Sequence, residues 1–155
     1  MRYLILSFIF LLSGCASMPV TDYIKADHPY ERKIYAGFEK VTSAVIFVMH
    51  QKGWSTSQGV DPAVYEQDER YESNGTENVL IFTDIKKHFR VFYSTYTHLN
   101  ILVHGLGGVC NVEVRFCKLT PLGKQFVTVR NDRLAQSILD SVEQEVRGQN
   151  LAPEQ

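Results

Sequence analysis

The chain has 155 residues, of which 45% are hydrophobic and 21% are charged. This length is sufficient for one domain with a sizeable hydrophobic core. The 16 basic and 17 acidic residues give a net charge of −1, so the chain lacks the basic excess with which proteins bind the phosphate backbone of nucleic acids.

The first residues have the layout of a secretory signal peptide. Arg2 supplies a positive charge, residues 3–12 form an apolar run, and two small residues lead to Cys15. Ten apolar residues span about 15 Å as a helix, half of a hydrocarbon core of roughly 30 Å. The run is therefore too short for a membrane-spanning anchor and is typical of a cleaved leader.

The tetrapeptide Leu12-Ser13-Gly14-Cys15 resembles the lipobox of bacterial lipoproteins. The resemblance implies that residues 1–14 are a signal peptide and that Cys15 carries acyl groups such as palmitate on its sulfur and on its new amino terminus. These acyl groups would anchor the protein to a membrane. In such lipoproteins an aspartate after the cysteine is associated with retention in the inner membrane, whereas Ala16 stands here. We therefore expect an outer-membrane protein that faces the periplasm.

Residues 15–30 are expected to form a lipidated tether, because Pro19 and Pro29 stand there among scattered polar residues. Residues 31–148 would form a single domain, followed by a tail over residues 149–155. No internal repeat or low-complexity tract interrupts this division.

The first predicted element is an amphipathic helix over residues 31–52, ended by Gly53. Its hydrophobic residues recur at spacings of three and four, which places them on one helical face. They are Ile34, Phe38, Val41, Val45, Val48 and Met49.

The middle of the chain predicts strands. Alternation of apolar and polar residues indicates strands over residues 97–104 and 109–118, and the glycine-rich segment 105–108 indicates a hairpin between them. Residues 78–85 are apolar on both faces, which favours a central strand.

The edges of this sheet are less defined by the sequence. Either Trp54–Ser57 or Tyr65–Arg70 is expected to add an edge strand. The aromatic stretch 86–96 fits either a long strand or an excursion from the sheet, and it stays unassigned.

A second amphipathic helix is predicted over residues 133–147. Asn131 or Asp132 offers a side-chain cap to its first turn, and Gly148 is expected to end it.

The order helix, three or four antiparallel strands, helix predicts an α+β two-layer sandwich of the helix-grip-like kind. Both helices would pack their apolar faces on one side of the sheet. The opposite side is expected to be polar and exposed to solvent, with Asn100, His104, Glu113 and Arg115 on it.

With Cys15 assigned to lipid, two cysteines remain. Within one strand Cys110 and Cys117 lie about 23 Å apart on opposite faces, whereas bridged Cα atoms lie within about 7 Å. We expect both thiols to be free, with Cys110 buried and Cys117 as the one able to react or pair with a partner.

No residue pattern points to catalysis or to a metal. His98 and His104 lie about 20 Å apart along one strand, too far to chelate one ion, and residues 105–108 lack the phosphate-loop pattern. A group of carboxylates is expected to form a solvated acidic loop: Asp61, Glu66, Asp68 and Glu69. We therefore expect no catalytic residue, no metal ligand and no cofactor, and the ligand-binding residues remain unknown.

The lipobox, the tether and the domain pattern resemble small envelope lipoproteins of Gram-negative type. The domain is loosely similar to the helix-grip-like domains of BamC, an accessory of the outer-membrane β-barrel assembly machinery. The pattern that carries this similarity consists of Phe38–Gly53, residues 97–118 and Leu134–Val146. No distinctive motif supports it, and a shared fold does not confer function.

We expect a non-catalytic, lipid-anchored envelope protein that contacts an envelope protein partner as an interaction or accessory module in assembly or transport. The alternative is a periplasmic binder of a small hydrophobic ligand or lipid in a cavity between helix and sheet. The 9 phenylalanines and 8 tyrosines could line such a cavity, although they could equally fill the core.

Overall fold

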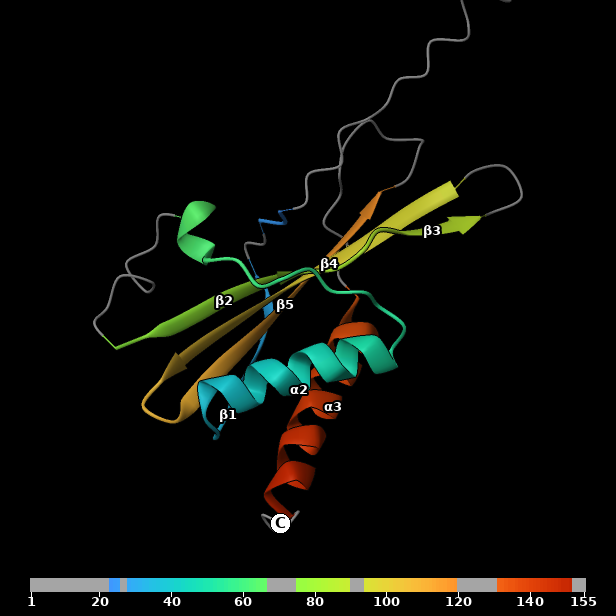
Figure 1. Ribbon diagram of the computed structural model, residues 1–155. Helices are drawn as coiled ribbons and strands as arrows, with labels where there is room; N and C mark the ends of the chain where they lie inside the picture. The colour runs from blue at the N-terminus through green and yellow to red at the C-terminus, as the bar shows by residue number, and fades with distance from the viewer. Residues whose placement is uncertain (1–22, 26–27, 67–74, 90–93, 120–130, 152–155) are drawn as a thin grey trace, which may run out of the picture.

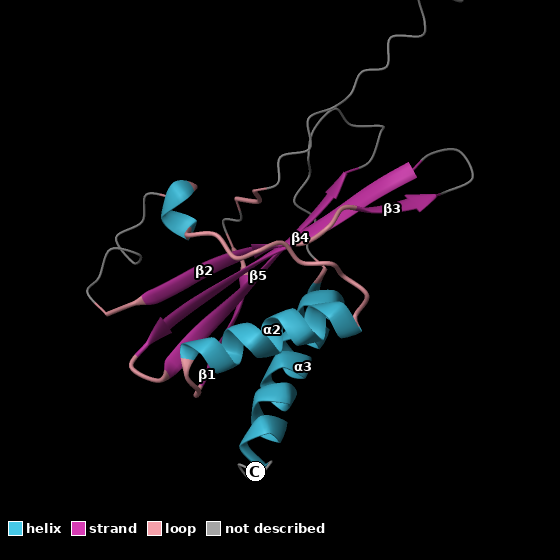
Figure 2. Ribbon diagram, in the orientation of Figure 1, coloured by secondary structure: helices cyan, strands magenta, loops and turns pink. Residues whose placement is uncertain are grey.

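The computed structural model describes residues 23–25, 28–66, 75–89, 94–119 and 131–151. They form an α+β sandwich in which two helices cover one face of a five-stranded antiparallel sheet (Figures 1 and 2). The predicted fold class is therefore confirmed. In chain order the elements are β1 (Tyr30–Ile34), α2 (Phe38–Gln51), the 3-10 helix η1 (Pro62–Val64), β2 (Glu77–Phe82), β3 (Lys86–Phe89), β4 (Ser94–Leu106), β5 (Val109–Leu119) and α3 (Asp132–Leu151).

The long strand β4 organises the sheet. The strand order is β1-β5-β4-β2, and β3 pairs with the part of β4 that lies beyond β2. The β4–β5 hairpin closes through Gly107 and Gly108, both of which have positive φ. A two-residue hairpin turn needs this conformation, which glycine adopts without steric cost. The predicted hairpin is therefore confirmed.

The first predicted helix is shorter than expected, because residues 30–34 form a strand. Ile34 belongs to β1, pairs with Cys110 of β5 and is buried in the same core as α2. Ile34 is four residues before Phe38, a spacing that fits a helix, but the chain turns between the two residues. At the other end Gly53 has φ +76 and ends the helix as predicted.

The edge opposite β1 also differs from expectation. β2 is not central, because it lies at the end of the strand order. On its other side the described residues form two isolated bridges, Thr56 with Thr83 and Val60 with Leu80. The apolar outer residues of β2 are instead covered by the segment that contains η1. The other predicted edge strand was Tyr65–Arg70. Tyr65 and Glu66 are not in a strand, and residues 67–70 lie outside the described part.

The unassigned stretch 86–96 contains β3 and the start of β4, with residues 90–93 outside the described part. The last helix, α3, begins with the predicted cap, because the Asn131 side chain accepts a hydrogen bond from the Leu134 amide at 3.2 Å. The helix then continues through Gly148 to Leu151, so the predicted stop is wrong. Of the described helices, none is both long and apolar enough to cross a membrane.

The main core lies between the helices and one face of the sheet, which we call the helix face. α2 and α3 bury their apolar stripes there, as their spacing predicts. The sheet contributes alternate residues of β2, β4 and β5: Ile81, Leu99, Ile101, Val103, Cys110, Val112, Val114 and Phe116. Gly105 passes so close beneath α2 that an added Cβ would lie 2.9 Å from Phe38 Cδ2.

The opposite face, which we call the second face, is polar as predicted but it is not exposed to solvent. Asn100, Glu113 and Arg115 are 0%, 2% and 4% exposed, and only His104 is half-buried. The segment 23–25, which falls within the predicted tether, contacts Asn100 and Arg115 through Ile24, and Glu66 also contacts Arg115. The expectation of a wet face is therefore wrong, because local pattern does not reveal what a distant segment covers.

Candidate functional site

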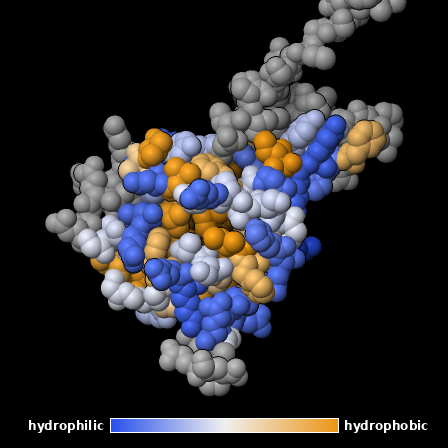
Figure 3. Space-filling model, viewed as in Figure 1, coloured by the Kyte–Doolittle hydropathy of each residue, from blue (hydrophilic) through white to orange (hydrophobic). Residues whose placement is uncertain are grey.

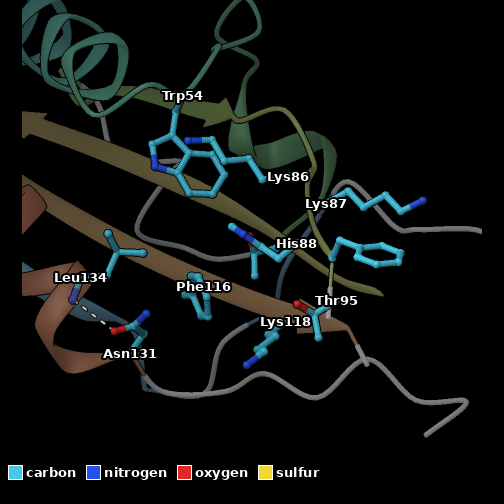
Figure 4. A pocket seen from close by; sticks show the side chains of 11 residues that line it. Trp54, Lys86, Lys87, His88, Thr95, Phe116, Lys118, Asn131 and Leu134 are labelled. Carbon is cyan, nitrogen blue, oxygen red and sulfur yellow. Dashed lines mark hydrogen bonds between the residues drawn. The ribbon is translucent and has the colours of Figure 1, made fainter. Parts of the chain in front are cut away.

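A groove of about 790 Å³ lies on the helix face at the end of the sheet, beyond the cover of the two helices. Figure 4 shows Trp54 and the start of α3 at its two ends, with residues of β3, β4 and β5 between them. We call it the cationic groove. Its lining residues are Trp54, Lys86, Lys87, His88, Phe89, Thr95, Thr97, Phe116, Lys118, Asn131 and Leu134.

Strand register places two of the three lysines in one row. Thr97 of β4 lies opposite Lys86 of β3 and opposite Lys118 of β5. Residues that lie directly opposite one another in neighbouring strands share a face. Lys86 and Lys118 therefore flank Thr97 on the helix face, and at about 4.8 Å per strand spacing their backbones are about 10 Å apart.

The floor of the groove is apolar. Trp54 and Phe116 are buried and Leu134 is half-buried, and all three pack at the margin of the main core. Lys86 Nζ lies 3.9 Å from the centroid of the Trp54 ring, which is a cation–π contact. This contact holds the Lys86 ammonium group over the floor.

The positive charge of the groove is not compensated nearby. No acidic residue is among the described residues that line it, and these lysines form no ion pair with a carboxylate of the described chain. The acidic residues next to the lining residues in sequence have other partners. Asp84 accepts a hydrogen bond from the Ser55 amide at 2.9 Å, and Asp132 accepts one from the Tyr30 hydroxyl.

The surface around β3 combines charge with apolar side chains. Phe89 is 81% exposed, and Figure 3 shows hydrophilic and hydrophobic residues side by side at the end of the sheet where β3 and β4 lie. The groove thus offers ammonium groups and hydroxyl groups above an aromatic floor. This arrangement can hold an anionic group that is attached to an apolar body.

A second polar cluster is buried on the second face. Arg115 donates to Glu113 Oε2 at 3.0 Å through Nη2 and to Glu66 Oε1 through Nη1. Burial lowers the pKa of Arg115, but the hydrogen bonds to Glu66 and Glu113 outweigh that effect, so its pKa is raised. The guanidinium group stays charged, and its two carboxylate partners offset the cost of burying it.

The segment that contains Tyr23 and Ile24 is fastened to this cluster. The Ile24 amide donates to Asn100 Oδ1 at 2.5 Å, and its carbonyl accepts from Arg115 at 3.4 Å. The Tyr23 hydroxyl donates to Glu66, and its ring stacks on Tyr65 with centroids 5.1 Å apart. Burial and the hydrogen bond to Glu66 raise the pKa of Tyr23 to about 12. We call this segment, residues 23–25, the N-terminal clamp.

The two cysteines in β5 are free and buried. Burial raises the pKa of both thiols, and the negative charge of Glu77 raises that of Cys110 further. Cys117, expected to be the one able to react, lies opposite His98 on β4, and both side chains are buried. Because the thiolate is the nucleophile, neither cysteine is poised for reaction.

The structure does not bring the remaining candidate residues together into one site. His104 Nδ1 bonds to Asn78 rather than approaching His98. In the described ranges no group of three His, Cys, Asp or Glu side chains could hold a metal ion. Glu66 was expected in a solvated loop, but it is half-buried against Arg115; Asp61 caps η1; residues 68 and 69 lie outside the described part, as does Cys15.

Sequence reasoning missed the cationic groove. The adjacent lysines 86 and 87 were visible in the sequence. Lys118 is 32 residues after Lys86, and the two share a row only because both strands pair with β4. Comparison with known proteins adds no family: no protein-family model matches this chain, and no curated protein matches it at a significant level.

Proposed function

We propose that this protein is a non-catalytic lipoprotein of a Gram-negative-type cell envelope that acts as an interaction or accessory module in assembly or transport. The tetrapeptide Leu12-Ser13-Gly14-Cys15 supports an anchor of acyl groups on Cys15, at the periplasmic side of the outer membrane. The observation that carries the interaction role is the cationic groove, in which Lys86 and Lys118 flank Thr97 without carboxylate partners in the described chain.

The groove supports recognition because, within the described chain, no carboxylate pairs with its lysines to offset their mutual repulsion. Like charges that gather in one hollow repel one another and weaken the folded state. An anionic partner would relieve this repulsion and would find a shaped, partly apolar surface. Functional surfaces commonly carry such locally unfavourable arrangements.

The buried thiols support a non-catalytic role. Cys110 and Cys117 are the nucleophiles that the sequence singled out beside Cys15. Burial raises the pKa of each thiol, which disfavours the reactive thiolate at neutral pH.

The N-terminal clamp supports a position close to the membrane. Cys15 precedes Tyr23 by eight residues, and an extended chain spans at most about 3.5 Å per residue, or about 28 Å in total. A domain fastened at Tyr23 would therefore stay within roughly that distance of an acylated Cys15.

The geometry gives less support to an enclosed cavity for a neutral hydrophobic ligand. Between the helices and the sheet the core side chains of α2 and α3 are almost fully buried. The cationic groove, by contrast, is open and has lysines in its lining. An uncharged ligand would leave these charges unused.

The anchor is tested by labelling the full chain with radioactive palmitate in a Gram-negative host, with Cys15→Ala as the control variant. We expect label in the wild type, none in the variant, and the labelled protein in the outer-membrane fraction. A wild-type chain that takes up no label and keeps its leader in intact-mass analysis would overturn the anchor.

The interaction role is tested by crosslinking in the intact envelope at native expression level. We expect a crosslinked envelope protein with the wild type. A wild-type chain that is recovered alone contradicts the role.

A further inference from the structure

We propose that the cationic groove binds one phosphate-bearing lipid, with its headgroup at the lysine row and the start of its apolar part on the aromatic floor. This inference rests on the groove being the recognition site of the protein. It does not depend on acylation of Cys15, so the two can fail separately.

The headgroup position follows from the lysine row. Lys86 and Lys118 flank Thr97, and their flexible side chains start about 10 Å apart. Both ammonium groups can therefore reach one anion placed above Thr97. The two non-bridging oxygens of a phosphodiester can accept charge-assisted hydrogen bonds from both ammonium groups, and lysine is a common phosphate ligand.

The apolar part of the ligand follows from the floor. Trp54, Phe116 and Leu134 line the groove next to the lysine row. Trp54 and Phe116 are already buried, so most of the apolar surface that an occupant can cover belongs to the half-buried Leu134 and the exposed Phe89. A lipid would cover this surface and gain the corresponding hydrophobic free energy, whereas a free phosphate ion would not.

The backbone of the groove argues against a peptide as the occupant. A peptide is commonly held by hydrogen bonds from its backbone to a free strand edge. Here the floor is a sheet face, and β4 at its centre is paired on both sides, with β3 and with β5, so an occupant of the floor meets side chains. Recognition therefore depends on side chains, which suits a charged headgroup.

The volume is consistent with one ligand. About 790 Å³ lies within the range of roughly 300–1,000 Å³ that is typical of small-molecule sites. The groove would hold a headgroup and the first part of its chains, and the remainder would leave through the open side. The exposed Phe89 at the rim provides further apolar contact there.

The chain contains a single tryptophan, Trp54, so its fluorescence reports directly on the groove. We would titrate the full chain in non-ionic detergent with dihexanoylphosphatidylglycerol. Dihexanoylphosphatidylcholine has the same chains but no net charge, and glycerol 3-phosphate and inorganic phosphate carry the anion without the chains. An acidic peptide tests whether a protein segment occupies the groove instead.

We expect a saturable change in Trp54 fluorescence with the anionic lipid alone. Lys118→Gln should weaken the apparent affinity roughly tenfold, the loss of one charge-assisted contact. Lys33→Gln removes the same charge outside the groove and should bind as the wild type does. Lys86→Gln should weaken binding similarly, with a changed starting spectrum because Lys86 contacts the ring.

Equal binding of the zwitterionic lipid would overturn the inference, because the lysines would then not be used. Glycerol 3-phosphate or inorganic phosphate binding as tightly as the lipid would also overturn it, in favour of a free phosphate. Saturation by the acidic peptide alone would assign the groove to a protein partner. A chain that binds the lipid but takes up no palmitate would retain this inference and lose the proposed anchor.

Discussion

The two faces of the sheet are both buried, but by different means. On the helix face, α2 and α3 cover the strands with apolar side chains that match the period of each element. On the second face, the N-terminal clamp and residues near η1 cover a guanidinium group and two carboxylates. The comparison shows that polar residues alternating along a strand indicate a chemically distinct face, not necessarily a wet one.

The difference has an energetic consequence. A buried apolar face tolerates the loss of one methyl group at a time, with a cost that grows with the cavity left behind. A buried ion cluster is coupled, because removal of one partner leaves the others without compensation. Four substitutions test whether the two faces differ in this way.

The largest effect is expected for Arg115→Met, which removes the buried guanidinium group that donates to Glu113 and Glu66 on the second face. Removing one member of a buried ion pair costs about 3–5 kcal/mol, and we expect a loss of that size in the free energy of unfolding measured with urea. Lys118→Met is the matched control on β5, since Lys118 is half-buried and makes no ion pair in the described chain. A loss below 1 kcal/mol for Arg115→Met would show that the cluster is solvated in solution.

Leu139→Ala tests the helix face. Leu139 is fully buried in the main core, and truncation of a buried leucine costs about 2–5 kcal/mol. The same urea titration should show this loss, whereas Gln144→Ala on the exposed side of α3 should change stability by less than about 0.5 kcal/mol. Equal effects of the two changes would contradict the position of α3.

The N-terminal clamp should loosen at alkaline pH. The pKa of Tyr23 is raised in the folded state to about 12 from its ordinary value of 10. The contribution of Tyr23 to stability is therefore complete below about pH 10 and is lost as the pH rises through 10 to 12. Tyr23→Phe should lose less stability than the wild type over this window in thermal unfolding, while the exposed Tyr35→Phe should follow the wild type. Identical curves for Tyr23→Phe and the wild type would refute the link.

The smallest effect is expected for Arg32→Ala. Arg32 pairs with Asp140 and Glu143 of α3, but this cluster is partly exposed, and such pairs contribute about 0–1 kcal/mol. A loss of that size in the free energy of unfolding, measured with urea, would show that the exposed ion pairs of Arg32 stabilise the fold much less than the buried ones of Arg115. A loss near 3 kcal/mol would mean that ion pairs are equally important on both faces.

Much of the fold could be predicted because its signals are local. The stripe from Val41 to Met49, the hairpin glycines and the Asn131 cap each act within a few residues, and the structure places all of them as expected. β1 was missed because Ile34 happens to continue the helical spacing of Phe38. Gly148 was misread as a stop because packing of α3 against the sheet and α2 outweighs the modest cost of one glycine in a helix.

The candidate site could be predicted much less. His98, His104 and the cysteines were weighed as chemistry from their spacing alone, yet the groove and the Arg115 cluster join residues from distant parts of the chain. Glu66 meets Arg115 across 49 residues, and Tyr23 meets it across 92. No spacing rule covers contacts of that kind, because they depend on which face each segment crosses.

The sequence by itself determined the α+β class, the two amphipathic helices and the β4–β5 hairpin. It also predicts an acylated Cys15. Each of these depends on periodicity, turn chemistry or a short contiguous motif, which the chain carries locally. Only the tertiary structure decided that the second face is covered and that Lys86 and Lys118 share one groove. Both follow from strand register and from the path of a distant segment, and these are set by the packing of the whole domain.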